Sequence, residues 1–150
     1  MRQYVGKGER ERWGIYVHVP WCRRRCPYCD FYFEIGQSKT GFAQRILNEF
    51  KLKKNMWPSY APHTLYLGGG TPSLLSFEEL STCIGGLKEA TGSIEWEVSL
   101  EANPEDLTPA LLGHLRAAGV DRLSIGLQSF DDQYLEWLGR AHRSAHAKDV

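Results

Sequence analysis

The sequence predicts an α/β fold built from four βα units. Strand-like and helix-periodic segments alternate along the 150 residues, each strand-like segment runs into glycine, proline or polar residues, and no repeat or low-complexity tract interrupts the series. Such alternation is typical of a parallel sheet with helices packed outside it. The pattern allows two arrangements of that sheet, an open doubly wound sheet or an arc of a barrel.

The first unit pairs a short strand with an amphipathic helix. Residues 14–20 have the β-branched and aromatic content of a strand, and Pro20 ends it because proline cannot donate to a sheet ladder. The helix is predicted over 39–56, where apolar residues recur at spacings of four, one and three: Phe42, Ile46, Leu47 and Phe50.

The second unit begins with a strand over 63–70, which runs into three glycines. Its helix is predicted over 76–91. Ser76 followed by Glu79 indicates a capping box, in which each side chain satisfies an amide that the helix start leaves unpaired.

Two further units complete the series. Strands are predicted over 94–104 and 120–130, and helices over 108–119 and 131–140. Residues typical of helix ends support these boundaries: Thr108 as a cap, Pro109 as a first residue, and Gly119 and Gly139 as stops.

Composition excludes several function classes. The 18 basic and 18 acidic residues give a formal charge of zero, so nothing electrostatic favours nucleic acid or an anionic membrane as a partner. No apolar run approaches the roughly 20 residues that span a bilayer. The N-terminal stretch lacks the apolar region of a secretory signal. We therefore expect a cytoplasmic protein without a membrane-spanning segment, whose thiols stay reduced.

Special residues follow every predicted strand. Three cysteines come after the first strand and the glycines 68–70 end the second, while Glu101 ends the third and Gln128 the fourth. The carboxyl ends of parallel strands lie at one edge of a sheet, which is where ligands bind in α/β proteins. These residues are therefore expected at one binding edge.

The cysteines Cys22, Cys26 and Cys29 admit three interpretations. A disulfide framework is the weakest in a reducing compartment. A structural zinc module needs four ligands, and only His18 lies near enough to complete the set. An iron–sulfur cluster held by three thiolates would keep one iron open for a ligand. Cys83, within a predicted helix, is expected to be a small buried hydrophobe.

The spacing Cys-x₃-Cys-x₂-Cys after a first strand resembles the signature of the radical S-adenosylmethionine (SAM) superfamily. The words YVHVPWC, GGGTPS, EANPE, RLSIGLQSFDD and LGRAH resemble, in order and spacing, its coproporphyrinogen-oxidase-like branch, from about Trp13 to the end. The resemblance implies that Cys22, Cys26 and Cys29 hold a [4Fe–4S] cluster. It also implies that SAM chelates the open iron and is split by one electron into a deoxyadenosyl radical.

The same resemblance places eight residues around the nucleotide and assigns no catalytic residue. The eight are Tyr16, Tyr28, Gly69, Gly70, Thr71, Glu101, Gln128 and Arg140. Tyr16 is expected against the cluster and Tyr28 near the adenine, and the backbone of residues 69–71 at the amino group of SAM. Taken singly, each has a plainer explanation, such as a turn glycine, a solvated charge or a helix-end cation.

One position separates two functions within this branch. The oxidases carry a further cysteine two residues after the third, where this sequence has Phe31, and the form CDF resembles the haem chaperone subfamily. The resemblance thus implies a haem chaperone-like protein that passes haem or a porphyrin to an apo-protein, with a flavodoxin or ferredoxin as electron donor. The alternative is an oxygen-independent coproporphyrinogen III oxidase, which decarboxylates porphyrinogen propionates. Haem-binding residues are expected past residue 150.

A complete barrel takes roughly 250 residues. Residues 1–150 are therefore expected to form the N-terminal part of a radical SAM core domain. This part would be a partial βα barrel with four parallel strands in sequential order. Its inner face and its edge beyond 120–130 are expected to be apolar, because missing strands would cover them.

Overall fold

The computed structural model describes residues 12–36, 39–57, 61–92 and 95–150, so the N-terminal stretch lies outside the described residues. Its four strands form one parallel sheet in the order β1-β2-β3-β4. Their bounds are Gly14–Val19, Thr64–Gly69, Glu97–Ala102 and Arg122–Ile125. The order never reverses within the described chain. The predicted barrel arc is confirmed, and a doubly wound sheet is excluded.

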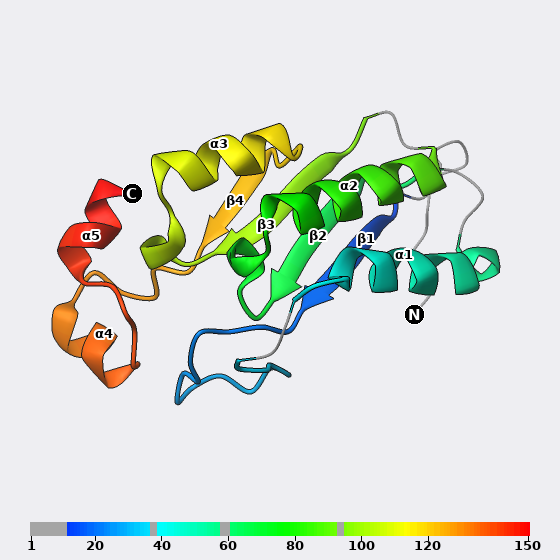
Figure 1. Cartoon of the computed structure of the whole chain (residues 1–150). Coiled ribbons are helices and arrows are strands. Elements are labelled where there is room, and N and C mark those ends of the chain that lie inside the picture. The colour runs from blue at the N-terminus through cyan, green and yellow to red at the C-terminus, as the bar shows by residue number, and fades with distance from the viewer. Residues whose placement is uncertain (1–11, 37–38, 58–60, 93–94) are drawn as a thin grey trace, which may run out of the picture.

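Three helices lie along one face of the sheet, as Figure 1 shows: α1 (Phe42–Leu52), α2 (Phe77–Thr91) and α3 (Pro109–Ala117). Two short helices, α4 (Asp132–Trp137) and α5 (Ser144–Asp149), follow β4 and lie beyond the strand ends. Three 3-10 turns, η1 (Lys54–Met56), η2 (Pro72–Leu74) and η3 (Pro104–Asp106), complete the elements. No helix in the described residues is long and apolar enough to cross a bilayer.

The core lies between the sheet and the three long helices. Alternate strand residues point towards the helices, and Val17, Leu67, Leu100 and Leu123 stand in register across the four strands. The first three are buried, and Leu123 packs against them from the edge. Period-two alternation in the sequence thus produces one continuous apolar layer.

The opposite, inner face of the sheet is polar, so the expectation of an apolar inner face is wrong. Tyr16, Tyr66, Ser99 and Arg122 stand in register there. Arg122 donates from Nε to Ser99 Oγ at 3.1 Å and pairs through Nη2 with Glu97 Oε1 at 2.9 Å. Because these groups satisfy one another, the face does not depend on apolar cover.

Several boundaries also differ from the prediction. β4 ends at Ile125 rather than at residue 130, and its exposed side chains are Arg122 and Ser124, so the expected apolar edge is wrong too. Gln128 consequently lies in the loop after β4, with a φ of 66°. Helix α5 was not predicted, because six residues are too few for a clear helical period.

The capping box at the start of α2 is only half formed. Ser76 Oγ accepts from the amide of Glu79 at 3.2 Å, as predicted. The carboxylate of Glu79 does not return to Ser76. It accepts from the amides of Gly41 at 2.6 Å and Ala43 at 2.7 Å, where α1 begins without a side-chain cap of its own. One carboxylate therefore caps a second helix and joins α1 to α2.

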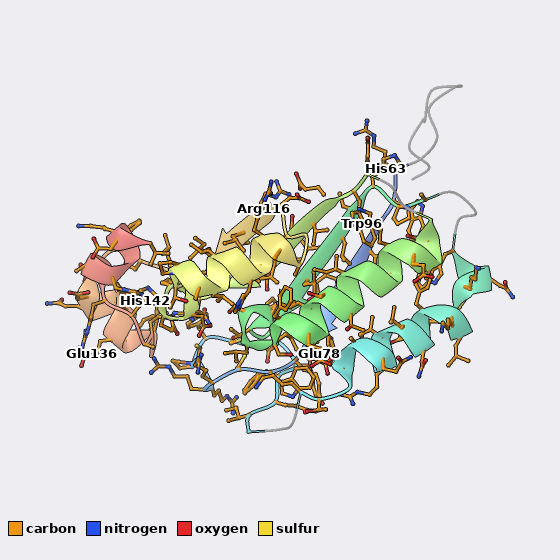
Figure 2. The ribbon with its side chains drawn as sticks, turned by 45° about the horizontal axis from the view of Figure 1, so that its top comes forward. His63, Glu78, Trp96, Arg116, Glu136 and His142 are labelled. Atoms are coloured by element: carbon orange, nitrogen blue, oxygen red, sulfur yellow. The ribbon has the colours of Figure 1, made fainter. Side chains whose placement is uncertain are left out.

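We predict that Glu79→Ala lowers the free energy of unfolding by about 2 kcal/mol, because two amides lose a charged acceptor. Glu78→Ala is the matched control, since Glu78 is exposed in the same helical turn (Figure 2) and has the same favourable charge for the helix dipole. Denaturant unfolding of both variants measures the difference. Equal midpoints would show that the bond to α1 contributes nothing.

Candidate functional site

The cysteine loop, residues 20–36, leaves the carboxyl end of β1 and folds back on itself. Cys22 donates its amide to Glu34 O at 3.0 Å, and Glu34 donates to Pro20 O at 2.8 Å. Within the loop, the amide of Cys29 donates to Cys26 O at 3.1 Å. These bonds close the base of the loop and leave all three thiols half-buried.

A cavity of about 260 Å³ lies at this edge of the sheet. All three loop cysteines line it, together with seven of the eight residues expected around the nucleotide. Tyr16 is the exception and lies outside the lining. Cys83 is fully buried in the core, where burial raises the pKa of its thiol to about 12. The structure therefore brings together residues from the loops after all four strands.

The glycine segment, residues 69–71 at the end of β2, uses its backbone amides for hydrogen bonds within the protein. Gly69 donates to Glu101 Oε2 at 2.9 Å, Gly70 to Val19 O at 2.7 Å and Thr71 to Trp21 O at 2.7 Å. An anion that needs amide donors finds none in this segment. The carbonyl oxygen of Thr71 accepts from the amide of Leu74 at 3.0 Å, so those of Gly69 and Gly70 are the ones that suit a cationic amino group of a ligand.

Gly70 and Gly69 are needed for two different reasons. A Cβ on Gly70 would lie 2.7 Å from Trp21 O, so only glycine lets this segment approach the cysteine loop. Gly69 has a φ of 109°, which side chains rarely adopt. The packing of the first two loops thus depends on residues without side chains.

Glu101 supports the glycine segment from β3. Besides the bond to Gly69, its Oε1 accepts from Tyr66 OH at 2.8 Å. Burial and the bond to Glu101 raise the pKa of Tyr66, which keeps its phenol protonated as a donor. The ring of Tyr66 stacks on Tyr16 with centroids 6.1 Å apart. Tyr16 therefore contacts the site indirectly, through Tyr66 and Glu101.

Arg140, which follows α4, reaches across the cavity to several loops. Its Nη2 donates to Asn103 Oδ1 at 2.5 Å and to Gly126 O at 2.9 Å. Its Nη1 lies 3.8 Å from Cys26 Sγ and 3.5 Å from Tyr28 OH. The buried Nε of Arg140 has no hydrogen-bond partner among the described residues. The guanidinium group of Arg140 thus contacts three loops, and one of its N–H groups remains unpaired among the described residues.

Asn103 belongs to this site although we did not predict it from the sequence. Its amide nitrogen donates to Thr71 Oγ1 at 3.3 Å, and Thr71 Oγ1 in turn lies 3.8 Å from Cys22 Sγ. The available signal was its place two residues after Glu101, at the same edge of the sheet. Two cysteine sulfurs therefore each have a donor from another loop.

The loop after β4 is held by His142, which lies two residues before α5. His142, labelled in Figure 2, is buried. Its Nε2 lies 3.0 Å from Leu127 O and its Nδ1 3.4 Å from Glu105 Oε2. Leu127 precedes Gln128, whose left-handed backbone turns the loop at the cavity. His142 ends the word LGRAH, but we did not predict a role for it, because its partners lie in two other loops.

The thiols fit a cluster better than a single ion. In the described part of the chain, no three His, Cys, Asp or Glu side chains are arranged to hold one metal ion. Structural zinc needs such convergence. In a [4Fe–4S] cluster each thiolate binds a different iron, so the sulfurs share a cavity without meeting at one point. Three cysteines on one cavity are compatible with a cluster held by three thiolates.

Comparisons with known proteins support the family that the sequence motifs indicate. A family model described as the Radical SAM superfamily matches residues 16–150. The chain is 35% identical over 138 residues to the heme chaperone HemW of Escherichia coli (strain K12), which covers 89% of this chain and 36% of that protein. It is 36% identical over 140 residues to the mitochondrial radical S-adenosyl methionine domain-containing protein 1 of Bos taurus, with shares of 91% and 32%. The chain spans about a third of these relatives.

Solved structures give the same result. The coproporphyrinogen III oxidase HemN of Escherichia coli, described as a radical SAM enzyme, superimposes with a TM-score of 0.73 at 26% identity, over 91% of this chain and 33% of that one. Elp3 of Methanocaldococcus infernus shares the fold, with a TM-score of 0.56 at 17% identity, over 91% and 33%. Because the family model matches most of the sequence, this chain belongs to the radical SAM superfamily.

Proposed function

We propose that this chain is the cluster- and nucleotide-binding part of a haem chaperone-like radical SAM protein. Cys22, Cys26 and Cys29 hold the [4Fe–4S] cluster, and the cavity beside them binds SAM. The observation that carries the proposal is that these thiols and seven expected nucleotide contacts line one cavity. When bound, the cluster supplies an open iron and one electron for cleavage of the sulfonium.

The protein's own groups suit the parts of SAM. The backbone of residues 69–71 can accept from its amino group, most directly through the carbonyl oxygens of Gly69 and Gly70, since that of Thr71 already accepts from Leu74. Arg140 lines the cavity and can pair with its carboxylate through the guanidinium group. Glu101 has an acceptor position left on each oxygen for ribose hydroxyls. Tyr28 can stack on the adenine. Tyr16 is assigned a supporting role behind Glu101.

Phe31 favours the chaperone over the oxidase. It lines the cavity with 67% of its surface exposed, at the position where the oxidases of this branch place a cysteine. The relatives named HemW favour the same choice. The protein would then bind haem or a porphyrin and pass it to an apo-protein in the cytoplasm, with a flavodoxin or ferredoxin as reductant. The structural similarity to HemN favours the oxidase as the second candidate.

The cluster assignment predicts a clear difference between cysteines. After anaerobic reconstitution with iron and sulfide, Cys22→Ala should lose most of its bound iron and its visible absorption, because one iron loses its thiolate. Cys83→Ala should keep both, since Cys83 lies in the core. Iron and sulfide analysis measures the outcome. A colourless Cys83→Ala protein, or a fully loaded Cys22→Ala protein, would refute the ligand assignment.

The nucleotide assignment predicts that Glu101→Ala weakens SAM binding roughly ten- to a hundredfold, the usual effect of losing a charged hydrogen bond. Cluster content should stay unchanged. Glu97→Ala is the control, because Glu97 is on the same face of β3 and pairs with Arg122 instead. Equilibrium dialysis with the reconstituted protein measures both. Equal dissociation constants for the two variants would remove Glu101 from the site.

Two chimeras separate the chaperone from the oxidase. Residues 13–150 replace the matching segment of Escherichia coli HemW in one and of HemN in the other. We expect the HemW chimera to bind haem, and the HemN chimera to lose coproporphyrinogen III decarboxylation because Phe31 replaces the cysteine. Phe31→Cys in the HemN chimera should restore part of the activity. Full decarboxylation with Phe31 in place would favour the oxidase.

A further inference from the structure

A buried carboxylate outside the nucleotide contacts holds the cysteine loop. Arg23 directly follows Cys22 and donates to Asp106 Oδ1, from Nε at 2.8 Å and from Nη2 at 2.7 Å. Ser73 Oγ donates to the other oxygen, Oδ2, at 2.9 Å. The side chain of Asp106 is only 2% exposed, whereas that of Arg23 is 60% exposed. The contact is therefore a partly buried ion pair with both carboxylate oxygens engaged.

The three residues come from three successive loops. Arg23 lies in the cysteine loop after β1, Ser73 in η2 after β2, and Asp106 in η3 after β3. A single carboxylate thus joins three of the four loops that surround the cavity. Glu105, the neighbour of Asp106, and Arg24, the neighbour of Arg23, both line that cavity. Arg23 itself also lines the cavity, so the ion pair borders the site directly.

The stretch between Cys22 and Cys26 has little else to fix it. Within the described chain, the amides of residues 23–25 make no backbone hydrogen bond. Arg23, Arg24 and Arg25 are all exposed, and within the described residues only Arg23 pairs with a buried carboxylate. A loop without backbone bonds samples many conformations unless side chains restrain it. The Arg23–Asp106 pair supplies that restraint.

We propose that Asp106 is a positioning residue for the cluster site. Through Arg23 it holds the stretch from Cys22 to Cys26 in one conformation, so that these thiols are in place before a cluster arrives. The proposal rests on the proposed function, because it assigns the restrained thiols to the cluster. Asp106 itself makes no hydrogen bond to either thiol, and it restrains the stretch from Cys22 to Cys26 through Arg23.

Because Asp106 is buried and Arg23 is exposed, the better test substitution is at Asp106. Removing Arg23 would leave a buried carboxylate without its cation, which destabilises the whole fold. Asp106→Asn removes the buried charge, keeps an acceptor for Ser73, and leaves Arg23 free in water. Arg25→Gln is the matched control, because it removes a cation from the same loop without touching the pair. Arg23→Lys keeps the charge and loses the two-point contact, so it should fall between.

The first experiment needs no cofactor. Reduced, metal-free protein is treated with iodoacetamide, and the alkylation rate of each cysteine is followed by peptide mass spectrometry. In Asp106→Asn we expect Cys22 and Cys26 to react about fivefold faster than in the parent, because the loop opens locally. Buried Cys83 should react at the parent's rate and thereby report an intact fold. Unchanged rates at Cys22 and Cys26, or a parallel rise at Cys83, would overturn the proposal.

The second experiment connects the restraint to the cluster. Reconstituted proteins are exposed to an iron chelator, and the loss of visible absorption is timed. Asp106→Asn should lose its cluster several-fold faster than the parent and Arg25→Gln, and Arg23→Lys at an intermediate rate. Equal rates in all four proteins would overturn the positioning role. A parent that takes up no iron would instead refute the proposed function, and the alkylation rates would still show whether the pair restrains the loop.

Discussion

The structure depends on one constraint, the parallel register of four strands in sequential order. It sends every loop after a strand to the same edge of the sheet, so that residues far apart in sequence line one cavity. The register continues past the strands, where Gly70 donates to Val19 O and Thr71 to Trp21 O. Those two bonds place the glycine segment directly against the cysteine loop. A side chain at Gly70 would break that contact. The two hydrogen bonds that extend the pairing of β1 and β2 therefore also hold the site together.

The two faces of the sheet have different roles: one forms the hydrophobic core, and the other carries polar side chains that lead to the site. The face towards the helices is a continuous apolar layer, and Glu79 strengthens it by joining α1 to α2. The inner face carries tyrosines, serines and charges that satisfy one another. Glu101 stands where this polar face meets the loop edge. Its bond to Gly69 fixes the last residue of β2, from which the chain enters the loop at the cavity.

Sequence reasoning predicted the features that depend on local pattern. The alternation of elements, the caps at Ser76 and Thr108 and the gathering of residues at one edge follow from periodicity or short motifs, whereas the sequential strand order was implied by the family resemblance. It missed Asn103, Asp106 and the second role of Glu79, because each acts on a residue more than 30 positions away. It also extended β4 too far, since Leu127 continues the apolar alternation although the backbone has already turned.

The missed residues share a property that explains why a motif alone does not make a site. Asn103 and His142 belong to the words EANPE and LGRAH, yet like Asp106 they act by holding the loops that carry the cysteines and the expected nucleotide contacts. Hydrogen bonds to cysteine sulfur help to set the potential of a bound cluster. Here those donors are Thr71 at Cys22 and Arg140 at Cys26, and Asn103 orients both. An amide that touches no sulfur thus fixes the direction of two donors that do, and it couples the cysteine loop to the nucleotide side of the cavity.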